Sequence, residues 1–144
     1  MAAEPAFALE WFRGEAKSFL FQMVPNPVGG IVGRTIQFTM RKKLGTNTEL
    51  LILSSDPDVN DPTLGSISFV NALLGTARIS FTSKSTAAMK LDAVDEDNNP
   101  VLDELGAQVG IWQADVQFTD AGHEAVPSRG TVTLRHPVRA FPTP

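Results

Sequence analysis

The sequence predicts an all-β domain, either an antiparallel β-sandwich or a small barrel, and three observations lead to this fold class. Short segments in which apolar and polar residues alternate recur along the chain, as half-buried strands require. Clusters of Gly, Pro, Asn and Asp separate these segments and supply turn residues. Good helix formers are concentrated in residues 83–91, which suffice for one or two helical turns.

The clearest strand is predicted at residues 110–120. Trp112, Ala114, Val116 and Phe118 fall on one face of this stretch, and the residues between them are polar. Residues 130–135 alternate again, and the Asp and Gly of residues 120–124 suit a turn. The two segments therefore predict a C-terminal β-hairpin, with Trp112 in the core.

The rest of the chain supplies six further strand segments and one short helix. Strands are predicted over residues 9–13, 17–23, 35–41, 49–54, 66–69 and 77–82. The last two are expected to pair as a hairpin, and residues 83–91 to cross between sheets as a short helix capped by Ser83 or Ser85. An acidic loop, residues 92–106, leads to the final hairpin, and no repeat of fixed period is visible.

Composition limits the classes of function. A chain of 144 residues fits one domain. The absence of cysteine excludes thiol catalysis, zinc-thiolate sites and disulfides. A net charge of −4 argues against binding to nucleic acid or anionic lipid, and no apolar run approaches the ~18 residues of a membrane span. With no basic N-terminal leader, we expect a protein made in the cytosol whose partners are proteins.

The acidic loop is the first candidate for a ligand site. Residues 95–99 place oxygen atoms at alternate positions, as a calcium loop begins. However, Pro100 stands where an EF-hand needs its sixth-position Gly, and Gly106 stands where it needs the twelfth-position Glu. We interpret residues 92–106 as a solvated acidic loop, with calcium as the alternative.

The other candidate motifs also lack the groups that their chemistry needs. The glycine-rich residues 29–35 have no P-loop lysine and precede a strand, so a hairpin turn is predicted. His123 and His136 lack the spacing of metal ligands, and Ser128 lacks a nucleophile-elbow context. The prediction is therefore a protein with no catalytic, cofactor or metal site.

The two chain ends are the predicted interface. Phe7, Leu9 and Trp11 share one face at strand spacing, and Phe141 stands in a Pro-rich tail. The alternative is that Trp11, and with it Leu9, belongs to the domain's first strand and helps to close its core, and this interpretation is favoured for Trp11. Phe7 and Phe141 are predicted to dock on adjacent subunits, by strand addition or as aromatic anchors. The predicted division is an arm at 1–9, a domain at 10–138 and a tail at 139–144.

Several segments, taken in order, are similar to a known family. They are FRGE (12–15), FLF (19–21), TIQFTMRK (35–42), GTARISFT (75–82), STAAM (85–89), WQADVQFTD (112–120) and GTVTL (130–134). Over roughly residues 10–138 the chain resembles the small immunoglobulin-like domain at the N-terminus of phage baseplate upper proteins, which also occurs as a stand-alone tail protein of tailed phages. Two departures are a longer loop at 94–106 and an end at Pro144, where a baseplate upper protein would continue into its attachment region for receptor-binding proteins.

The resemblance implies an immunoglobulin-like antiparallel β-sandwich with one short helix between strands. It also implies a small, non-enzymatic structural protein of the virion, in the tail, baseplate or neck, that binds other virion proteins in multiple copies. No nucleic acid, membrane or small-molecule substrate is expected. One alternative is a capsid cement or decoration protein. Another is a small-ligand or carbohydrate-binding module, which would need exposed aromatic residues, whereas most Phe and both Trp lie in predicted strands.

Overall fold

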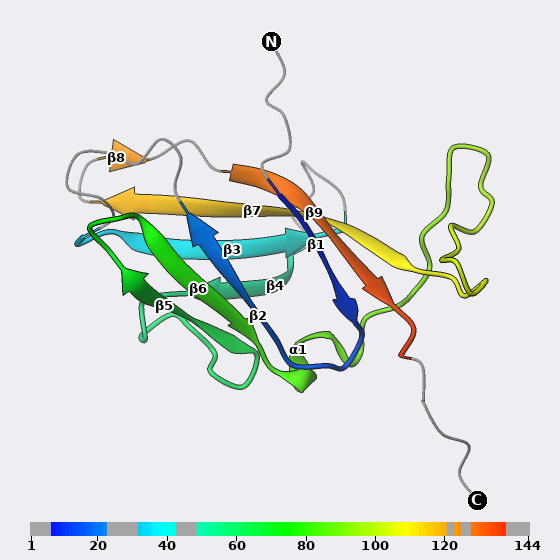
Figure 1. Cartoon of the computed structure of the whole chain (residues 1–144), viewed down its shortest axis with the longest axis horizontal. Helices are drawn as coiled ribbons and strands as arrows, with labels where there is room; N and C mark the ends of the chain where they lie inside the picture. The colour runs from blue at the N-terminus through cyan, green and yellow to red at the C-terminus, as the bar shows by residue number, and fades with distance from the viewer. Residues whose placement is uncertain (1–6, 23–31, 43–48, 121–122, 125–127, 138–144) are drawn as a thin grey trace, which may run out of the picture.

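The computed structural model describes residues 7–22, 32–42, 49–120, 123–124 and 128–137, which form two β-sheets and one short helix (Figure 1). In spatial order, the larger sheet contains β1 (Phe7–Phe12), β9 (Ser128–Arg135), β7 (Gly110–Asp120), β3 (Thr35–Arg41) and β4 (Glu49–Ser54), with the two-residue β8 (His123–Glu124) beside β7. The smaller sheet contains β2 (Lys17–Gln22), β6 (Thr76–Phe81) and β5 (Gly65–Asn71). The sheets are not closed, so the predicted all-β sandwich is confirmed and the barrel alternative is not.

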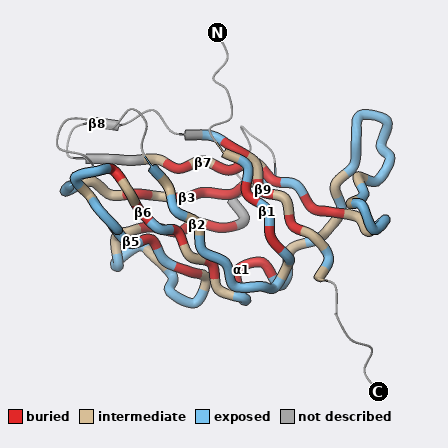
Figure 2. Tube along the Cα trace, viewed as in Figure 1, coloured by how far each residue is buried: buried red, intermediate tan, exposed pale blue. Residues whose placement is uncertain are grey.

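The alternation of side chains in β7 agrees with the sequence pattern. Trp112, Ala114 and Val116 are buried, while the side chains between them are partly exposed (Figure 2). The side chain of Phe118 lies outside the described ones. The predicted C-terminal hairpin is also confirmed, because β7 pairs with β9 in antiparallel register with Trp112 opposite Val132.

The second predicted hairpin is present in the smaller sheet. β5 and β6 pair in antiparallel register with Ile67 opposite Ile79, and both side chains are buried. The register shifts between Phe69 and Asn71, which leaves Val70 as an extra residue in β5. This bulge lies just before the turn that joins the two strands.

The larger sheet is mostly antiparallel, as predicted, and departs from this arrangement at one edge. β1 pairs with β9 in parallel, from Phe7 opposite Gly130 to Phe12 opposite Arg135. A short hairpin turn forces neighbouring strands to be antiparallel, but the first and last strands of a chain are under no such constraint. The alternation of residues within one strand carries no signal for its direction in the sheet.

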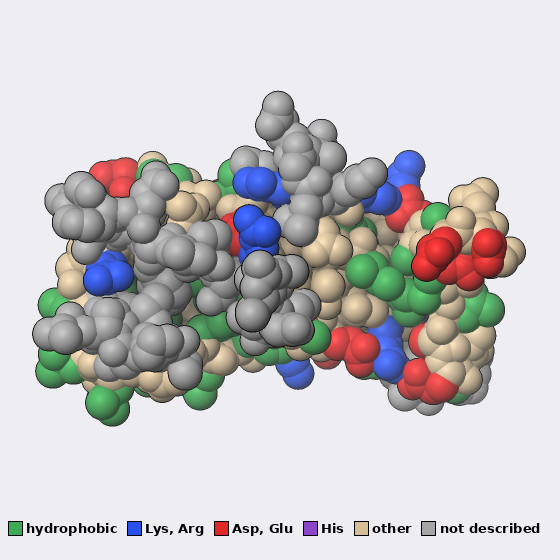
Figure 3. Space-filling model, turned by 90° about the horizontal axis from the view of Figure 1, so that it is seen from above, with side chains coloured by type: hydrophobic (Ala, Val, Ile, Leu, Met, Phe, Trp, Pro, Cys, Tyr) green, Lys and Arg blue, Asp and Glu red, His purple; other side chains and the backbone are tan. Residues whose placement is uncertain are grey.

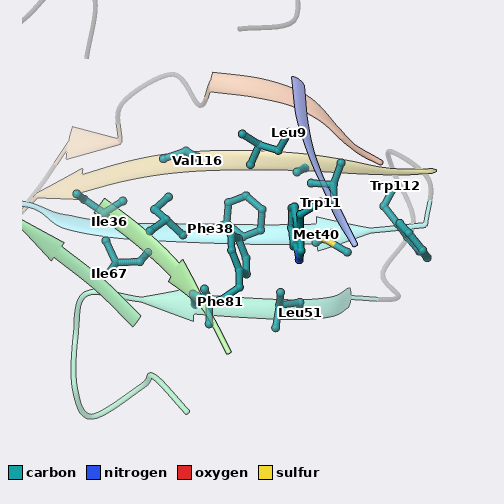
Figure 4. Packing of buried hydrophobic residues seen from close by; sticks show 14 of the residues in the cluster. Leu9, Trp11, Ile36, Phe38, Met40, Leu51, Ile67, Phe81, Trp112 and Val116 are labelled. Atoms are coloured by element: carbon teal, nitrogen blue, oxygen red, sulfur yellow. The ribbon is translucent and has the colours of Figure 1, made fainter. Parts of the chain in front are cut away.

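Aromatic side chains from both sheets meet in the core (Figure 4). The rings of Trp11 in β1 and Phe81 in β6 stack with centroids 4.6 Å apart. Phe38 in β3 meets Phe81 edge-on at 5.2 Å, and Trp11 also contacts Phe19 in β2 at 5.4 Å. Because Phe81 and Phe19 belong to the smaller sheet, these contacts hold the two layers together.

The predicted helix is present but begins with a different cap. α1 (Ser83–Thr86) follows β6 in the smaller sheet and precedes β7 in the larger one, as predicted. Its N-cap is Thr82, not Ser83 or Ser85, and Thr82 makes no side-chain capping bond. The Thr82 hydroxyl instead donates to the carbonyl of Thr63, and Ser85 donates its hydroxyl to the carbonyl of Thr82. The Thr82 side chain thus bonds to a distant loop and not to the start of the helix.

Candidate functional site

The residues predicted at the N-terminal interface lie in β1. Leu9 and Trp11 are 8% and 4% exposed and pack in the core, which agrees with their alternative interpretation as core residues. Phe7 is half-buried, and its ring meets that of Phe21 edge-on at 5.4 Å. Residues 7–9, assigned to the arm from the sequence, are therefore the first half of β1. The docking role of Phe7 stays a prediction, and Phe141 lies outside the described residues.

The acidic segment contains a repeat that the sequence analysis missed. The Asp95 carboxylate accepts hydrogen bonds from the amides two and four residues later, both at 2.9 Å. The Asp103 carboxylate makes the same two bonds, at 2.8 and 3.0 Å. Asn98 and Gly106, three residues after these aspartates, both have positive φ, at 65° and 83°. An eight-residue unit therefore occurs twice, and we refer to residues 93–109 as the acidic repeat.

Three backbone hydrogen bonds hold the acidic repeat together. The amide of Ala93 donates to the carbonyl of Val109 at 2.9 Å, Val101 donates to Ala93 at 2.9 Å, and Val109 donates to Val101 at 3.0 Å. These three residues are eight apart, so equivalent positions of the repeat bond to one another in a closed ring. The available sequence signal was the similarity of Ala-Val-Asp-Glu at 93–96 to Val-Leu-Asp-Glu at 101–104, but differences at the other positions of the repeat hide it.

Hydrogen bonds from the backbone account for two carboxylates of the acidic repeat. Asp95 and Asp103 use the same oxygen, Oδ1, to accept both amide bonds, as turn-forming aspartates do. Across the described ranges, no group of three or more His, Asp or Glu residues is arranged to hold a metal ion. The acidic side chains gather at the end of the molecule formed by this segment (Figure 3).

Arg135, the last residue of β9, ties the acidic repeat to the larger sheet. Its Nη1 lies 2.6 Å from Glu104 Oε1, and its Nη2 lies 3.0 Å from Glu10 Oε1 in β1. The backbone amide of Glu104, followed by the hydrogen bond from Arg135, lowers the pKa of the Glu104 carboxyl. The same ion pairs raise the pKa of Arg135.

A pocket of about 460 Å³ lies where α1 and the residues after it meet the beginning of β7. The Gly14 amide donates to the Thr86 hydroxyl at 2.9 Å, and Arg13 Nη1 donates to the Met89 carbonyl at 3.2 Å, which fixes this segment on the sheets. We call this cavity the lysine pocket. It is lined by Lys42, Leu64, Lys84, Ser85, Ala88, Met89, Lys90 and Trp112. No local sequence pattern indicates this pocket, because its residues come from four separate stretches of chain.

A cluster of exposed apolar side chains surrounds the β5–β6 turn. Phe69, Val70, Leu73 and Leu74 are 42%, 51%, 66% and 59% exposed, and we call them the apolar tip. The Leu74 amide donates to the backbone and side-chain oxygens of Asn71, both at 3.2 Å, which shapes the turn. The tip and the acidic repeat lie at opposite ends of the long axis (Figure 1).

The remaining candidate motifs lie in turns and strands where they are described. In the glycine-rich stretch, Gly33 has a φ of 75° in a turn that leads directly into β3, and residues 29–31 lie outside the described part. His123 and Ser128 are in β8 and β9, and His136 follows β9 with an exposed side chain. No helix within the described residues has the length and apolar character of a membrane span.

Comparison of the chain with protein-family models and with curated protein sequences finds no match.

Proposed function

We propose that this chain is a non-enzymatic structural protein of a tailed-phage virion, in the tail, baseplate or neck, where it binds other virion proteins. The observation that carries the protein-binding part is the apolar tip at the end of an open sandwich. The virion setting rests on the resemblance of its segments to the immunoglobulin-like domain of phage baseplate proteins.

The apolar tip suits a surface that another protein covers. Soluble monomers rarely expose large contiguous apolar patches, and such patches commonly mark interaction sites. The tip also adjoins β5, an edge strand of the smaller sheet, and edge strands are common sites for pairing with a partner strand. An aromatic ring and three aliphatic side chains beside a strand edge provide both anchors and backbone hydrogen bonds.

Mass spectrometry of purified particles of the phage that encodes the chain tests this proposal. We expect peptides of the chain in intact virions, at tens of copies or fewer per particle. Hundreds of copies would instead identify a capsid cement protein, which is the alternative within the structural class. Absence of the chain from intact particles would reject both.

A small-ligand-binding module is a second candidate function, and the lysine pocket is the observation that favours it. Its volume lies within the ~300–1,000 Å³ typical of small-molecule sites. Trp112 also lines the pocket and gives it an aromatic wall. From the sequence, Trp112 was expected only in the core.

A further inference from the structure

Lysine side chains are concentrated around one pocket of an otherwise acidic protein. The chain has five lysines and a net charge of −4. Three of the five, Lys42, Lys84 and Lys90, line the lysine pocket. Lys42 directly follows β3, Lys84 lies within α1 and Lys90 comes four residues after α1, so the fold brings them together.

Two of these lysines have acidic neighbours, and the third does not. Lys42 Nζ lies 2.7 and 2.9 Å from the two carboxylate oxygens of Asp92. Lys84 lies close enough to Asp61 to help lower the pKa of that carboxyl, after the stronger effect of the Thr63 hydrogen bonds. Lys90 has an exposed side chain, and no ion pair to it is found among the described residues. The rim therefore retains positive charge that an incoming anion can neutralise.

The walls of the lysine pocket are mostly apolar. Leu64, Ala88, Met89 and Trp112 line it beside the lysines. The indole N–H of Trp112 is buried without a hydrogen-bond partner among the described residues. An apolar cavity with a few polar groups at its rim is the usual form of a small-ligand site.

We propose that the lysine pocket binds a small organic anion, with an apolar body against Trp112, Met89 and Leu64 and a carboxylate near Lys84 and Lys90. The apolar lining accounts for the body, and the clustered lysines account for the charge. This inference rests on the pocket alone and holds whether or not the chain is a virion component.

A matched pair of probes separates the contribution of the apolar body from that of the carboxylate. 4-Phenylbutyrate and 4-phenylbutan-1-ol share one apolar body but differ in charge. Titration of the ¹⁵N-labelled protein with each should shift the indole N–H signal of Trp112, which the Trp11→Phe variant distinguishes from that of Trp11. We expect the carboxylate to bind at least about threefold more tightly than the alcohol, and only its affinity to fall as salt is added.

Substitution of the rim lysines tests the role of their charge. The double variant Lys84→Gln/Lys90→Gln should bind 4-phenylbutyrate about threefold or more weakly and leave binding of the alcohol unchanged. Lys17→Gln is the matched control, because Lys17 does not line the pocket, and should bind like the wild type. Equal affinity for the two probes, no loss in the double variant, or no shift of the Trp112 signal with 10 mM of either probe would overturn the proposal.

Discussion

Asp103 shows how a single carboxylate can organise a loop. Its Oδ1 accepts hydrogen bonds from the amides of Leu105 and Ala107, and Asp95 repeats the arrangement eight residues earlier. Each aspartate satisfies two backbone donors in a turn that has positive φ at its tip. The carboxylate of each aspartate therefore serves the local backbone.

Replacing Asp103 by Ala should loosen the second turn of the acidic repeat. The amides of Leu105 and Ala107 would lose their acceptor, so their hydrogen exchange should accelerate and the melting temperature should fall. Asp97→Ala is the control in the same segment, because no hydrogen bond is accepted by its side chain among those described. If exchange were unchanged in Asp103→Ala, or equally faster in Asp97→Ala, the assigned role would be wrong.

The same hydrogen bonds predict how acid acts on this turn. The Ala107 amide is the largest cause that lowers the pKa of Asp103 in the folded protein. A carboxyl whose folded pKa lies below its unfolded value contributes full stability above the unfolded pKa and loses it as the pH falls through the folded one. We expect the wild-type melting temperature to fall more steeply than that of Asp103→Ala below about pH 4. Parallel curves for the two proteins would contradict this expectation.

At Gly110 neighbouring atoms leave no room for a side chain, whereas at Gly106 the positive φ restricts which residues fit. A Cβ at Gly110 would overlap the ring of Trp112 and lie 2.8 Å from the carbonyl oxygen of Lys90. At Gly106 a Cβ would meet nothing within 4 Å, and the equivalent residue of the repeat is Asn98, also at positive φ. Gly110→Ala should therefore lower the free energy of unfolding by about 1–3 kcal/mol, and Gly106→Asn should change it little.

Urea denaturation of these two glycine variants makes the comparison. A Gly106→Asn protein less stable than Gly110→Ala would show that the equivalence of the two repeat units is wrong.

At the scale of elements, the aromatic contacts between β1, β3 and β6 connect the two sheets. Trp11 is buried and stacks on Phe81, so its truncation would leave a cavity between the layers. Trp11→Ala should lower the free energy of unfolding by about 3–5 kcal/mol, a large part of the ~5–15 kcal/mol of a typical domain. Leu20→Ala, on the exposed face of β2, should cost less than about 0.5 kcal/mol.

Chemical denaturation followed by tryptophan fluorescence gives both values, with Trp112 as the reporter in the Trp11 variant. A near-neutral effect of Trp11→Ala would mean that Trp11 belongs to an interface and not to the core.

Strands in which apolar and polar residues strictly alternate were predictable, because the local sequence alone shows which side chains are buried. β7 is the clearest case, since its buried face at Trp112, Ala114 and Val116 is set by its own period of two. The hairpins were predictable too, because the turn residues lie between the paired strands. The parallel pairing of β1 with β9 was not, since it depends on contacts between residues more than 110 positions apart, such as Phe7 and Gly130.

The candidate sites were the least predictable part. The lysine pocket forms only when Lys42, Leu64 and Trp112 converge with the segment after α1, and no local pattern reports that convergence. The apolar tip was predictable only as a turn, since the exposure of Leu73 and Leu74 depends on where the hairpin ends relative to the core. The role of Trp11 was ambiguous because its alternation with Phe7 and Leu9 fitted both a strand of the core and a docking arm.

The whole molecule is a sandwich with unlike ends. Hydrophobic side chains of the apolar tip lie at one end of the long axis, and the acidic repeat lies at the other (Figures 1 and 3). The acidic end is suited to water, since like charges on two copies would repel each other. The tip is suited to contact with a partner, so we expect the protein to dock through that end.

Substitution of exposed leucines tests most directly whether the protein docks through the apolar tip. We compare Leu73→Gln/Leu74→Gln with Leu20→Gln, which changes an equally exposed leucine on β2, away from the turn. Both proteins should melt close to the wild type, because surface substitutions cost within about 0.5 kcal/mol each. Quantitative mass spectrometry of particles assembled with each variant should find Leu20→Gln at wild-type abundance and the tip variant strongly depleted. Incorporation of the folded tip variant at the wild-type level would contradict the account.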